Sequence, residues 1–367
     1  MKRISLIEFI LMLAILASSC VLGLSVYTTY TKSGSEEKAK INVVETNIIG
    51  ETQDNTTSSG GKLEPSGETI FTSNTPVTNT FTGTKYYYNQ LDDYAKIIYQ
   101  AFENNIEDIK NGNYKIKFGK EFDDLLKQEN GNDVLNSAFQ RAWDAFSYDR
   151  PDIFYLDPNK LSITVETKKR ALITSYDVYC DAGNNGTYLE EGFSNKNEIN
   201  TAIQKIEQTK NEFVSQMSSM NDYEKVKALH DWIIENIEYD QNMQNVNRYN
   251  IYGALIDRKV VCEGYAKLFK YILDNVGIEC VLVSGTAVNS EGQNERHMWN
   301  YVRIGGNWYA VDCTWDDPII IGNGKVGNDV KYKYFLRGSD FYRDHTEEPI
   351  TEKSTTLKYP KISDYDY

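Results

Sequence analysis

The alternation of apolar and polar residues predicts several helices beyond about residue 86. Apolar residues lie three or four positions apart between Leu91 and Ile109, which is the spacing of one helix face. A second helix is predicted across Asp133–Asp149, and Pro151 ends it. A long helix from about Lys196 to Met220 follows, and the stretch "YEKVKALHDWIIENI" predicts another.

Strand patterns lie between and after these helices. The stretch "KLSITVETKKRALITSYDVYC" alternates on both sides of a polar turn, which predicts a β-hairpin. The stretch "HMWNYVRIGGNWYAVDCTWDD" predicts a second hairpin, with a tight turn around Gly305, Gly306 and Asn307. A further helix follows Cys262 and ends at Gly277; its apolar positions are Ala266, Phe269, Leu273 and Val276. Cys262 is therefore expected at or just before the first turn of this helix.

The first thirty residues predict a membrane-targeting segment. Lys2 and Arg3 precede an apolar run, Ile4 to Tyr27, whose only charge is Glu8. A run of about 20 apolar residues can span a bilayer, and positive charge before it keeps that end in the cytoplasm. We expect an uncleaved single-pass anchor with an extracytoplasmic C-terminal domain; the alternative is a cleaved signal peptide and a secreted protein. The leader is also similar to that of type IV pilin-like proteins, although Arg3 stands where that leader has glycine.

Composition divides the rest of the chain. Residues from about 31 to 85 are rich in Ser, Thr, Asn, Gly and acidic side chains, which bury too little apolar surface to form a core. The length of 367 residues allows one large domain or two smaller ones. The expected ranges are an anchor or signal segment (1–30), a flexible linker (31–85), a mixed N-terminal region (86–195), a core domain (196–350) and a C-terminal tail (351–367).

Charge and residue spacing exclude several classes of function. The formal net charge is -14, from 53 acidic and 39 basic side chains. A nucleic-acid partner needs a concentrated basic surface, so we expect no nucleic-acid binding. No Cys or His pair has the spacing of zinc ligands, and we therefore expect no metal site and no cofactor.

Cys262 is the candidate nucleophile. Unpaired N–H groups at the start of a helix favour an anion, and this promotes the reactive thiolate. A nucleophilic cysteine also needs a base, usually histidine, and the chain has 3 histidines. His230 lies within a helix among apolar residues and is expected to be a satisfied core or helix-surface histidine. His345 lies near the C-terminal end among charges, so His297 is the preferred base.

The predicted hairpin places an aspartate beside His297. If Gly305 and Gly306 form a two-residue loop, Trp299 faces Asp312 and His297 faces the residue two positions further on. Residues directly opposite share a face of the sheet, as do alternate residues along a strand. His297 and Asp312 are then diagonal neighbours within reach of a hydrogen bond. Asp312 is therefore the expected orienting group, rather than the two aspartates that follow the strand.

These motifs resemble the transglutaminase-like superfamily of cysteine enzymes. The matching stretches are "VCEGYAKLFKYILDNVGIECVLVSG" and "HMWNYVRIGGNWYAVDCTWDDP", with "HDWIIENIEYD" before them and "YFLRGSDFYRDH" after them. The resemblance covers roughly Tyr223 to His345. It implies an α+β fold with a papain-like or transglutaminase-like core, in which the helix that begins at the cysteine packs on an antiparallel sheet. It also implies that Cys262 is the nucleophile, His297 the general base and acid, and Asp312 the group that orients His297.

Other interpretations of the cysteines and tryptophans stay open. Cys262 alone would by default be a buried structural cysteine. Outside the cell a disulfide is a further alternative for Cys262, because Cys180, Cys280 and Cys313 are also available, although Cys280 and Cys313 lie in apolar strand patterns typical of the core. Three tryptophans lie near the proposed site in the sequence: Trp299, Trp308 and Trp315. They could pack in the core around the hairpin or form a hydrophobic rim around the site.

The sequence therefore predicts a membrane-tethered, extracytoplasmic cysteine enzyme. It would cleave or transfer acyl groups at amide bonds of protein or cell-wall peptide, through a thioester. Such chemistry needs an oxyanion hole, and the backbone N–H of Cys262 is the natural first donor. The alternative is a catalytically inactive member of the same fold that serves as a surface binding or assembly module.

Overall fold

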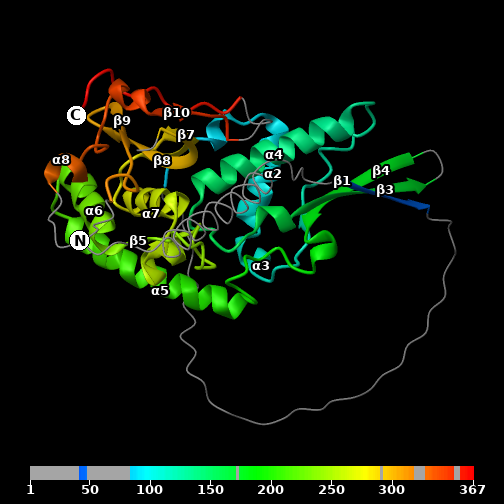
Figure 1. Ribbon diagram of the computed structural model, residues 1–367. Coiled ribbons are helices and arrows are strands. Elements are labelled where there is room, and N and C mark those ends of the chain that lie inside the picture. Colours follow the sequence, from blue (N-terminus) through cyan, green and yellow to red (C-terminus); the bar gives the residue numbers. More distant parts are fainter. Residues whose placement is uncertain (1–40, 48–82, 171–172, 290–291, 318–326, 351–355) are drawn as a thin grey trace, which may run out of the picture. The chain divides into compact units, whose positions relative to one another are not determined.

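The computed structural model describes residues 41–47, 83–170, 173–289, 292–317, 327–350 and 356–367 (Figure 1). The predicted anchor at 1–30 and most of the predicted linker lie outside these residues. In the part that is described, no helix is both long and apolar enough to cross a bilayer. One strand, β1 (Ile41–Asn47), falls within the range predicted as linker and pairs in parallel with β3 (Ser162–Arg170).

Helices and strands alternate along the described chain. The helices are α2 (Asp93–Asn104), α3 (Ile106–Ile109), α4 (Gly131–Asp149), α5 (Lys196–Met217), α6 (Asp222–Asn236), α7 (Cys262–Asn275) and α8 (Asn328–Lys331). The remaining strands are β2 (Ile116–Lys117), β4 (Ile173–Asp181), β5 (Glu238–Tyr239), β6 (Lys259–Val260), β7 (Cys280–Val288), β8 (Asn294–Ile304), β9 (Asn307–Val311) and β10 (His345–Glu347). The predicted helices and both predicted hairpins are confirmed.

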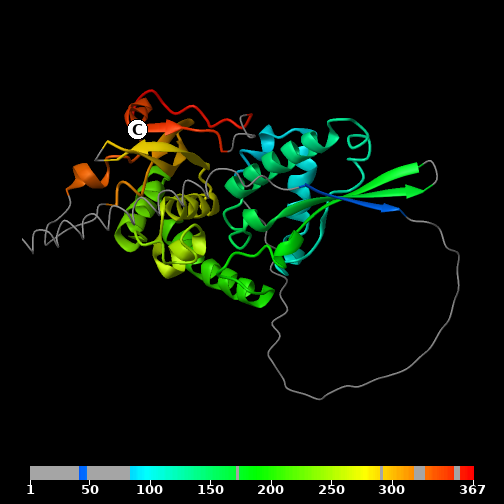
Figure 2. The ribbon, with the colours of Figure 1, turned by 45° about the vertical axis from the view of Figure 1, so that its right-hand side comes forward.

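Three α-helices (α2, α3 and α4) and a small sheet form the described part of the N-terminal region. The sheet has the order β1-β3-β4-β2, and Figure 2 shows β1 along the edge of the long β3–β4 hairpin. The side chain of Asp92 caps α2 by accepting a hydrogen bond from the N–H of Ala95 (3.0 Å). The helix ends at Asn104, earlier than the apolar spacing predicts, because Asn105 (φ -117°, ψ 19°) leaves helical geometry before α3 begins. Phe102 is buried against the rings of Phe118, Phe139, Trp143 and Phe146.

A four-stranded antiparallel sheet forms the C-terminal half. Its order is β10-β7-β8-β9, and α7 packs against β7 and β8 (Figure 1). The turn between β8 and β9 uses two glycines, Gly305 (φ 59°) and Gly306 (φ 87°), because both positions need positive φ. Ile304 pairs with Asn307, as the two-residue loop predicts. Strand β8 begins at Asn294, three residues before the expected start at His297.

Several contacts join the two halves of the described chain. The carboxylate of Asp149, at the end of α4, accepts hydrogen bonds from the N–H groups of Tyr87 (3.0 Å) and Tyr88 (2.8 Å). The hydroxyl of Tyr87 in turn donates to the carbonyl of Leu282 on β7. The described part of the predicted tail packs on the hairpin, where the N–H of Ser363 donates to the carbonyl of Trp308 (2.7 Å). The sheet that follows α7 is thereby bonded to the N-terminal region at β7 and to the C-terminal segment at β9.

Candidate active site

Cys262 is the first residue of α7, as the sequence predicts. The approach to the helix is fixed by the short parallel pair β5–β6 and by a hydrogen bond from the N–H of Val261 to the carbonyl of Arg248 (3.1 Å). A Cβ at Gly264 would lie 2.5 Å from the Cβ of Val260, so only glycine allows this close approach. The side chain of Cys262 is half-buried. The backbone N–H of Cys262 has no acceptor inside the helix. Unpaired N–H groups at the N-terminus of a helix favour an anion nearby.

His297 lies on β8 and joins Cys262 to Asp312. Its Nε2–H donates to Oδ2 of Asp312 (2.7 Å), which confirms the hydrogen bond predicted from the hairpin register. Cys262 lies close enough to His297 to help raise the pKa of its imidazole. The imidazole is almost completely buried, with 5% of its side chain exposed.

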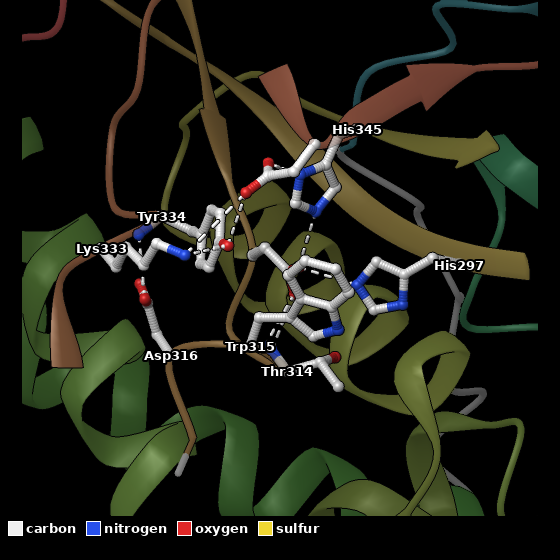
Figure 3. A network of polar contacts seen from close by, with 9 residues as sticks. His297, Thr314, Trp315, Asp316, Lys333, Tyr334 and His345 are labelled. Carbon is white, nitrogen blue, oxygen red and sulfur yellow. Dashed lines mark hydrogen bonds and ion pairs between the residues drawn. The ribbon is translucent and has the colours of Figure 1, made fainter. Parts of the chain in front are cut away.

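Asp312 follows the last residue of β9 and accepts four hydrogen bonds. Its Oδ1 accepts from the backbone N–H groups of Thr314 (2.9 Å) and Trp315 (3.2 Å), which close a tight turn after the strand. Its Oδ2 accepts from His297 and also from Nε2 of His345 (3.2 Å). Figure 3 shows the imidazoles of His297 and His345 close to the ring of Trp315. One buried carboxylate is thus held in place by two backbone and two side-chain donors.

These contacts set the charges of the site. Burial raises the pKa of the Asp312 carboxyl, but the charges and hydrogen bonds of His297, and then of His345, lower it by a larger amount. The pKa of Asp312 therefore lies well below its ordinary value. Burial lowers the pKa of His297, whereas the charge and hydrogen bond of Asp312, and then the hydrogen bond to Cys262, raise it to about 10. At neutral pH the site therefore holds an ionised aspartate next to an imidazolium. That imidazolium can stabilise a thiolate and protonate a leaving amine.

The two aspartates after Asp312 serve other residues. Asp316 Oδ2 lies 3.0 Å from Nε2 of His230, and both side chains are fully buried. Asp317 accepts a hydrogen bond from the hydroxyl of Tyr265 (2.6 Å). The choice of Asp312 over these two carboxylates as the partner of His297 is therefore confirmed. The prediction that His230 is a satisfied core histidine is confirmed as well.

His345 is a residue of this site that the sequence did not reveal. It begins β10, where it pairs with Ala287 of β7, and its side chain is fully buried. Its Nε2 contacts Asp312, and its Nδ1 lies 2.7 Å from Oδ1 of Asp344. The sequence offers little signal for this placement, because β10 is only three residues long and pairs with a strand far upstream.

The comparisons with known proteins agree with this geometry. Residues 211–313 match the model of the transglutaminase-like superfamily. This stretch is a transglutaminase-like domain. It contains Cys262, His297 and Asp312, whereas His345 lies beyond its matched range. The fold is α+β with a papain-like or transglutaminase-like core, in which α7 packs on the antiparallel sheet, as predicted.

Relatives of the transglutaminase-like domain occur in animals. The mouse kyphoscoliosis peptidase is 32% identical over 148 residues, which are 37% of this chain and 21% of the relative. The Caenorhabditis elegans Lim and transglutaminase domain protein ltd-1 is 24% identical over 170 residues, which are 39% of this chain and 23% of the relative. The chain thus spans about a fifth of the length of the curated relatives that it matches.

The solved structures that match part of the chain include a TGase and a putative cysteine protease from Cytophaga hutchinsonii. The first has a TM-score of 0.29 and 17% identity, over 47% of this chain and 49% of the other. The second has a TM-score of 0.26 and 18% identity, over 44% of this chain and 68% of the other.

The other cysteines of the described residues lie in the core. Cys180, Cys280 and Cys313 are buried free thiols, and so no disulfide joins any two described cysteines. Burial raises the pKa of each of these three thiols. The prediction that Cys280 and Cys313 are core residues is confirmed. Cys262 is the most exposed of the four described thiols.

Two of the three tryptophans predicted near the site contact His297. The ring of Trp315 stacks on the imidazole with a centroid distance of 5.2 Å, and Trp299 lies at 6.0 Å. Trp299 is buried, which is core packing, whereas Trp315 is half-buried beside the imidazole. Trp308 instead packs against Tyr86, outside this cluster.

One set of described residues in the domain has the geometry of metal ligands. The ligand atoms of His297, Asp312 and His345 all lie within 4.8 Å of one another. No local spacing indicates this set, because these residues are 15 and 33 positions apart in the chain. Both Nε2 atoms bond the same oxygen of Asp312, so each carries a proton in this arrangement. The observed contacts are therefore those of a proton-linked network.

Proposed function

We propose that this protein is an extracytoplasmic cysteine enzyme that acts on amide bonds of protein or cell-wall peptide. The observation that carries the proposal is the connected set of Cys262 at the start of α7, His297 on β8 and Asp312 after β9. A nucleophile, a base within hydrogen-bond reach and a carboxylate that orients the base are the parts that acyl transfer through a cysteine requires. A pure binding module has no physical need for this set.

The first half of the reaction forms a thioester. The Cys262 thiolate attacks the amide carbonyl carbon, and the carbonyl oxygen becomes an oxyanion. The N–H of Cys262 at the start of α7 is positioned to donate to that oxyanion. When the tetrahedral intermediate collapses, the C–N bond breaks and the imidazolium of His297 gives its proton to the leaving amine. The acyl group remains on sulfur, and His297 is left neutral.

The second half returns the enzyme to its starting state. Neutral His297 accepts a proton from an incoming water or amine, which attacks the thioester carbonyl. Breaking the C–S bond releases a carboxylic acid or a new amide, together with the thiolate beside the imidazolium. Asp312 keeps His297 in one tautomer and orientation through both halves, because Nε2 stays bonded to Oδ2. Hydrolysis and transamidation therefore use the same three residues.

The membrane location belongs to the same proposal. It is supported by the apolar run from Ile4 to Tyr27 and the basic residues before it. A polar stretch would connect this anchor to the domain, so that the enzyme acts near the outer surface of the membrane. Localisation of a C-terminal reporter fusion by protease accessibility in intact cells tests this arrangement. Protection of the reporter from protease would contradict it.

Alkylation of Cys262 tests the enzymatic proposal directly. Iodoacetamide at mildly acidic pH should label Cys262 much faster than it labels an ordinary thiol, because the imidazolium of His297 stabilises the thiolate. Peptide mass mapping assigns the label, and the buried Cys180, Cys280 and Cys313 act as internal controls. Labelling of Cys262 as slow as that of glutathione would favour the alternative, an inactive binding or assembly module.

Turnover assays then separate the two outcomes of the thioester. Incorporation of a fluorescent primary amine into a glutamine-containing protein reports transamidation, and formation of a free carboxylate, either glutamate in place of glutamine or a new carboxyl terminus, reports hydrolysis. The variant Cys262→Ala should abolish both while leaving the circular dichroism spectrum unchanged. Full activity in this variant would contradict the assignment of Cys262 as nucleophile.

A further inference from the structure

His345 is held between two carboxylates at the back of the proposed site. Its Nε2 lies 3.2 Å from Oδ2 of Asp312, and its Nδ1 lies 2.7 Å from Oδ1 of Asp344. The side chain of His345 is 0% exposed. A carboxylate oxygen that carries charge can only accept a hydrogen bond, so each ring nitrogen that faces one must donate. Both ring nitrogens of His345 thus face carboxylate acceptors, which is the arrangement that a doubly protonated imidazole makes.

The surroundings of His345 favour a cation. Aromatic rings enclose the imidazole: Phe341 stacks on it at a centroid distance of 3.9 Å, and Trp315, Trp299 and Tyr334 lie at 4.7, 5.1 and 5.2 Å. The faces of such rings carry negative charge density and attract cations. A buried charge is tolerated when it is paired and hydrogen-bonded, and here it has a carboxylate at each end.

The backbone brings His345 to this position through a close strand contact. Across the sheet, Gly285 of β7 pairs with His297 of β8 on one side and with Glu347 of β10 on the other. A Cβ at Gly285 would lie 1.9 Å from the carbonyl oxygen of Thr346 and 2.8 Å from the ring of Trp299. The missing side chain lets β10 approach β7, and this approach places His345 beside Asp312.

We propose that His345 is a positioning residue, which fixes the carboxylate of Asp312 and partly neutralises its charge toward His297. The proposal rests on the function proposed above, because it assigns His345 a role in the Cys262–His297–Asp312 reaction. Oδ2 of Asp312 divides its negative charge between two imidazolium donors. A single imidazolium partner would hold its proton more tightly, and His297 must release that proton to the leaving amine.

Other charged groups around His345 act in the same sense. Asp312 and Asp344 face its two nitrogens, and the ring of His297 lies 5.8 Å away. The hydroxyl of Tyr334 donates to the second oxygen of Asp344 (2.8 Å), and the ammonium of Lys333 lies 3.9 Å from that oxygen. Figure 3 shows Lys333, Tyr334 and His345 grouped on this side of the network. The carboxylate of Asp344 is thus held in place as the acceptor that faces Nδ1 of His345.

Two substitutions of His345 separate the hydrogen bond from the charge. His345→Phe keeps a ring in the aromatic enclosure but removes both donors. His345→Gln keeps one N–H donor for Asp312 but removes the charge. We expect His345→Phe to lower kcat/KM by about 10- to 100-fold, the usual loss when a partner that orients an active-site ligand is removed. His345→Gln should recover most of that loss.

The pH profile provides the readout that a merely structural role would not move. Removal of a nearby positive charge favours the protonated forms of the remaining groups. Both limbs of the bell-shaped kcat/KM profile should therefore move to higher pH in His345→Gln and in His345→Phe. His230→Gln is the matched control, because His230 is an equally buried histidine paired with Asp316. It should leave both limbs in place.

Asp344→Asn provides a variant that does not disturb the buried ring. The side chain of Asp344 is 29% exposed, so this substitution should fold even if His345→Phe does not. It leaves an amide oxygen that can accept from Nδ1 but removes the negative charge that favours a proton there, and should shift the profile in the same direction as His345→Gln. Unshifted limbs in both His345→Gln and Asp344→Asn, with wild-type kcat/KM, would overturn the proposal.

A measurement on the resting protein separates this proposal from the proposed function. Two-dimensional 1H–15N spectra of the full chain labelled with 15N-histidine, assigned with His345→Gln, report which ring nitrogens carry protons. We expect protons on both nitrogens of His345 at neutral pH, and one protonated nitrogen would overturn the inference. If Cys262 alkylates slowly and no turnover is found, the proposed function fails. If the wild type is active and only the His345 predictions fail, the proposed function stands without this inference.

Discussion

Asn300 on β8 donates a buried hydrogen bond of 3.0 Å to the carbonyl of Ala266 on α7. The bond joins the helix that begins at Cys262 to the strand that carries His297. Ala266 lies one helical turn after Cys262, and Asn300 lies three residues after His297. Asn300 is 1% exposed, so its amide has no access to bulk water. The distance between nucleophile and base therefore depends on a contact that belongs to neither residue.

Replacement of Asn300 by Leu should weaken both stability and catalysis. The variant loses the amide that holds α7 on the sheet, and we expect a loss of about 1–3 kcal/mol in the free energy of unfolding. It should also lower kcat/KM, because Cys262 and His297 are no longer held together. Urea unfolding and amine-incorporation kinetics measure the two effects.

Asn275→Leu is the control for the Asn300 variant. Asn275 donates to the carbonyl of Tyr271 (2.7 Å) within the last turn of α7, far along the helix from Cys262. Its loss should reduce stability modestly and leave kcat/KM unchanged. Equal kinetic effects of the two substitutions would show that the link between α7 and β8 has no special role.

Asp312→Asn should remove most of the activity. The amide keeps the shape of the side chain but not the charge that holds His297 protonated and in one tautomer. By analogy with the triad aspartate of serine proteases, we expect a loss on the order of 10³–10⁴-fold in kcat. Asp316→Asn is the matched control, because Asp316 is buried but bonds His230. A similar loss in both variants would point to damage of the fold.

The stability contributed by His297 should depend on pH in a defined window. Its pKa is raised from the ordinary 6.5 to about 10 in the folded protein. A group with a raised pKa stabilises the fold fully below its unfolded value, and this contribution is lost as the pH rises through the folded value. The free energy of unfolding of the wild type should therefore fall between about pH 6.5 and 10 relative to His297→Gln.

Urea unfolding of both proteins at pH 7 and pH 10 measures this difference. Lysines and tyrosines also titrate toward pH 10, but they do so in both proteins and cancel in the comparison. A gap between wild type and His297→Gln that stays constant across this range would contradict the raised pKa.

The buried ion pair of α7 should be needed as a pair. Lys270 and Asp274 are each 1% exposed and lie 2.8 Å apart, and the ammonium also donates to the carbonyl of Cys280 (2.9 Å). Burial raises the pKa of Asp274 to about 6, although Lys270 counteracts this effect. Lys270→Met leaves the carboxylate unpaired and should cost about 3–5 kcal/mol of stability.

The double variant Lys270→Met/Asp274→Leu should regain much of that loss, since an apolar pair of similar size often replaces a buried ion pair without cost. The half-exposed pair of Arg303 and Glu279 provides the control, and Arg303→Met should cost less than about 1 kcal/mol. Thermal or urea unfolding measures all three. A double variant as unstable as Lys270→Met would show that packing, not charge, is the cause.

Gly285→Ala should disturb β10. The added Cβ would meet the carbonyl oxygen of Thr346 at 1.9 Å, which requires the strand to move. Overpacking of this kind costs about 1–3 kcal/mol. Because the moving strand carries His345, the variant should also shift the pH profile as His345→Gln does. Val288→Ala is the control, because Val288 is an exposed residue of β7, the strand that contains Gly285, and it should have neither effect. A Gly285→Ala variant with unchanged stability and pH profile would argue against the close contact between β7 and β10.

Local sequence patterns predicted the helices and strands and one residue pair of the proposed site, His297 and Asp312. The spacing of apolar residues locates α4, α5 and α7 to within a few residues. The glycine turn between β8 and β9 fixes the register of the hairpin. Since side chains alternate along a strand, this register alone places His297 and Asp312 on one face. The hydrogen bond between them was predictable because both residues belong to one local hairpin.

Tertiary structure decided what joins to that pair. His345 reaches Asp312 through β10, which pairs with β7 some 58 residues upstream, with Ala287 opposite His345. Three residues carry no readable periodicity, and the choice of partner strand depends on the space that Gly285 leaves. The pairing of Asp316 with His230 likewise depends on where α6 places that histidine. Such contacts arise from packing between elements distant in sequence, and only the folded chain specifies them.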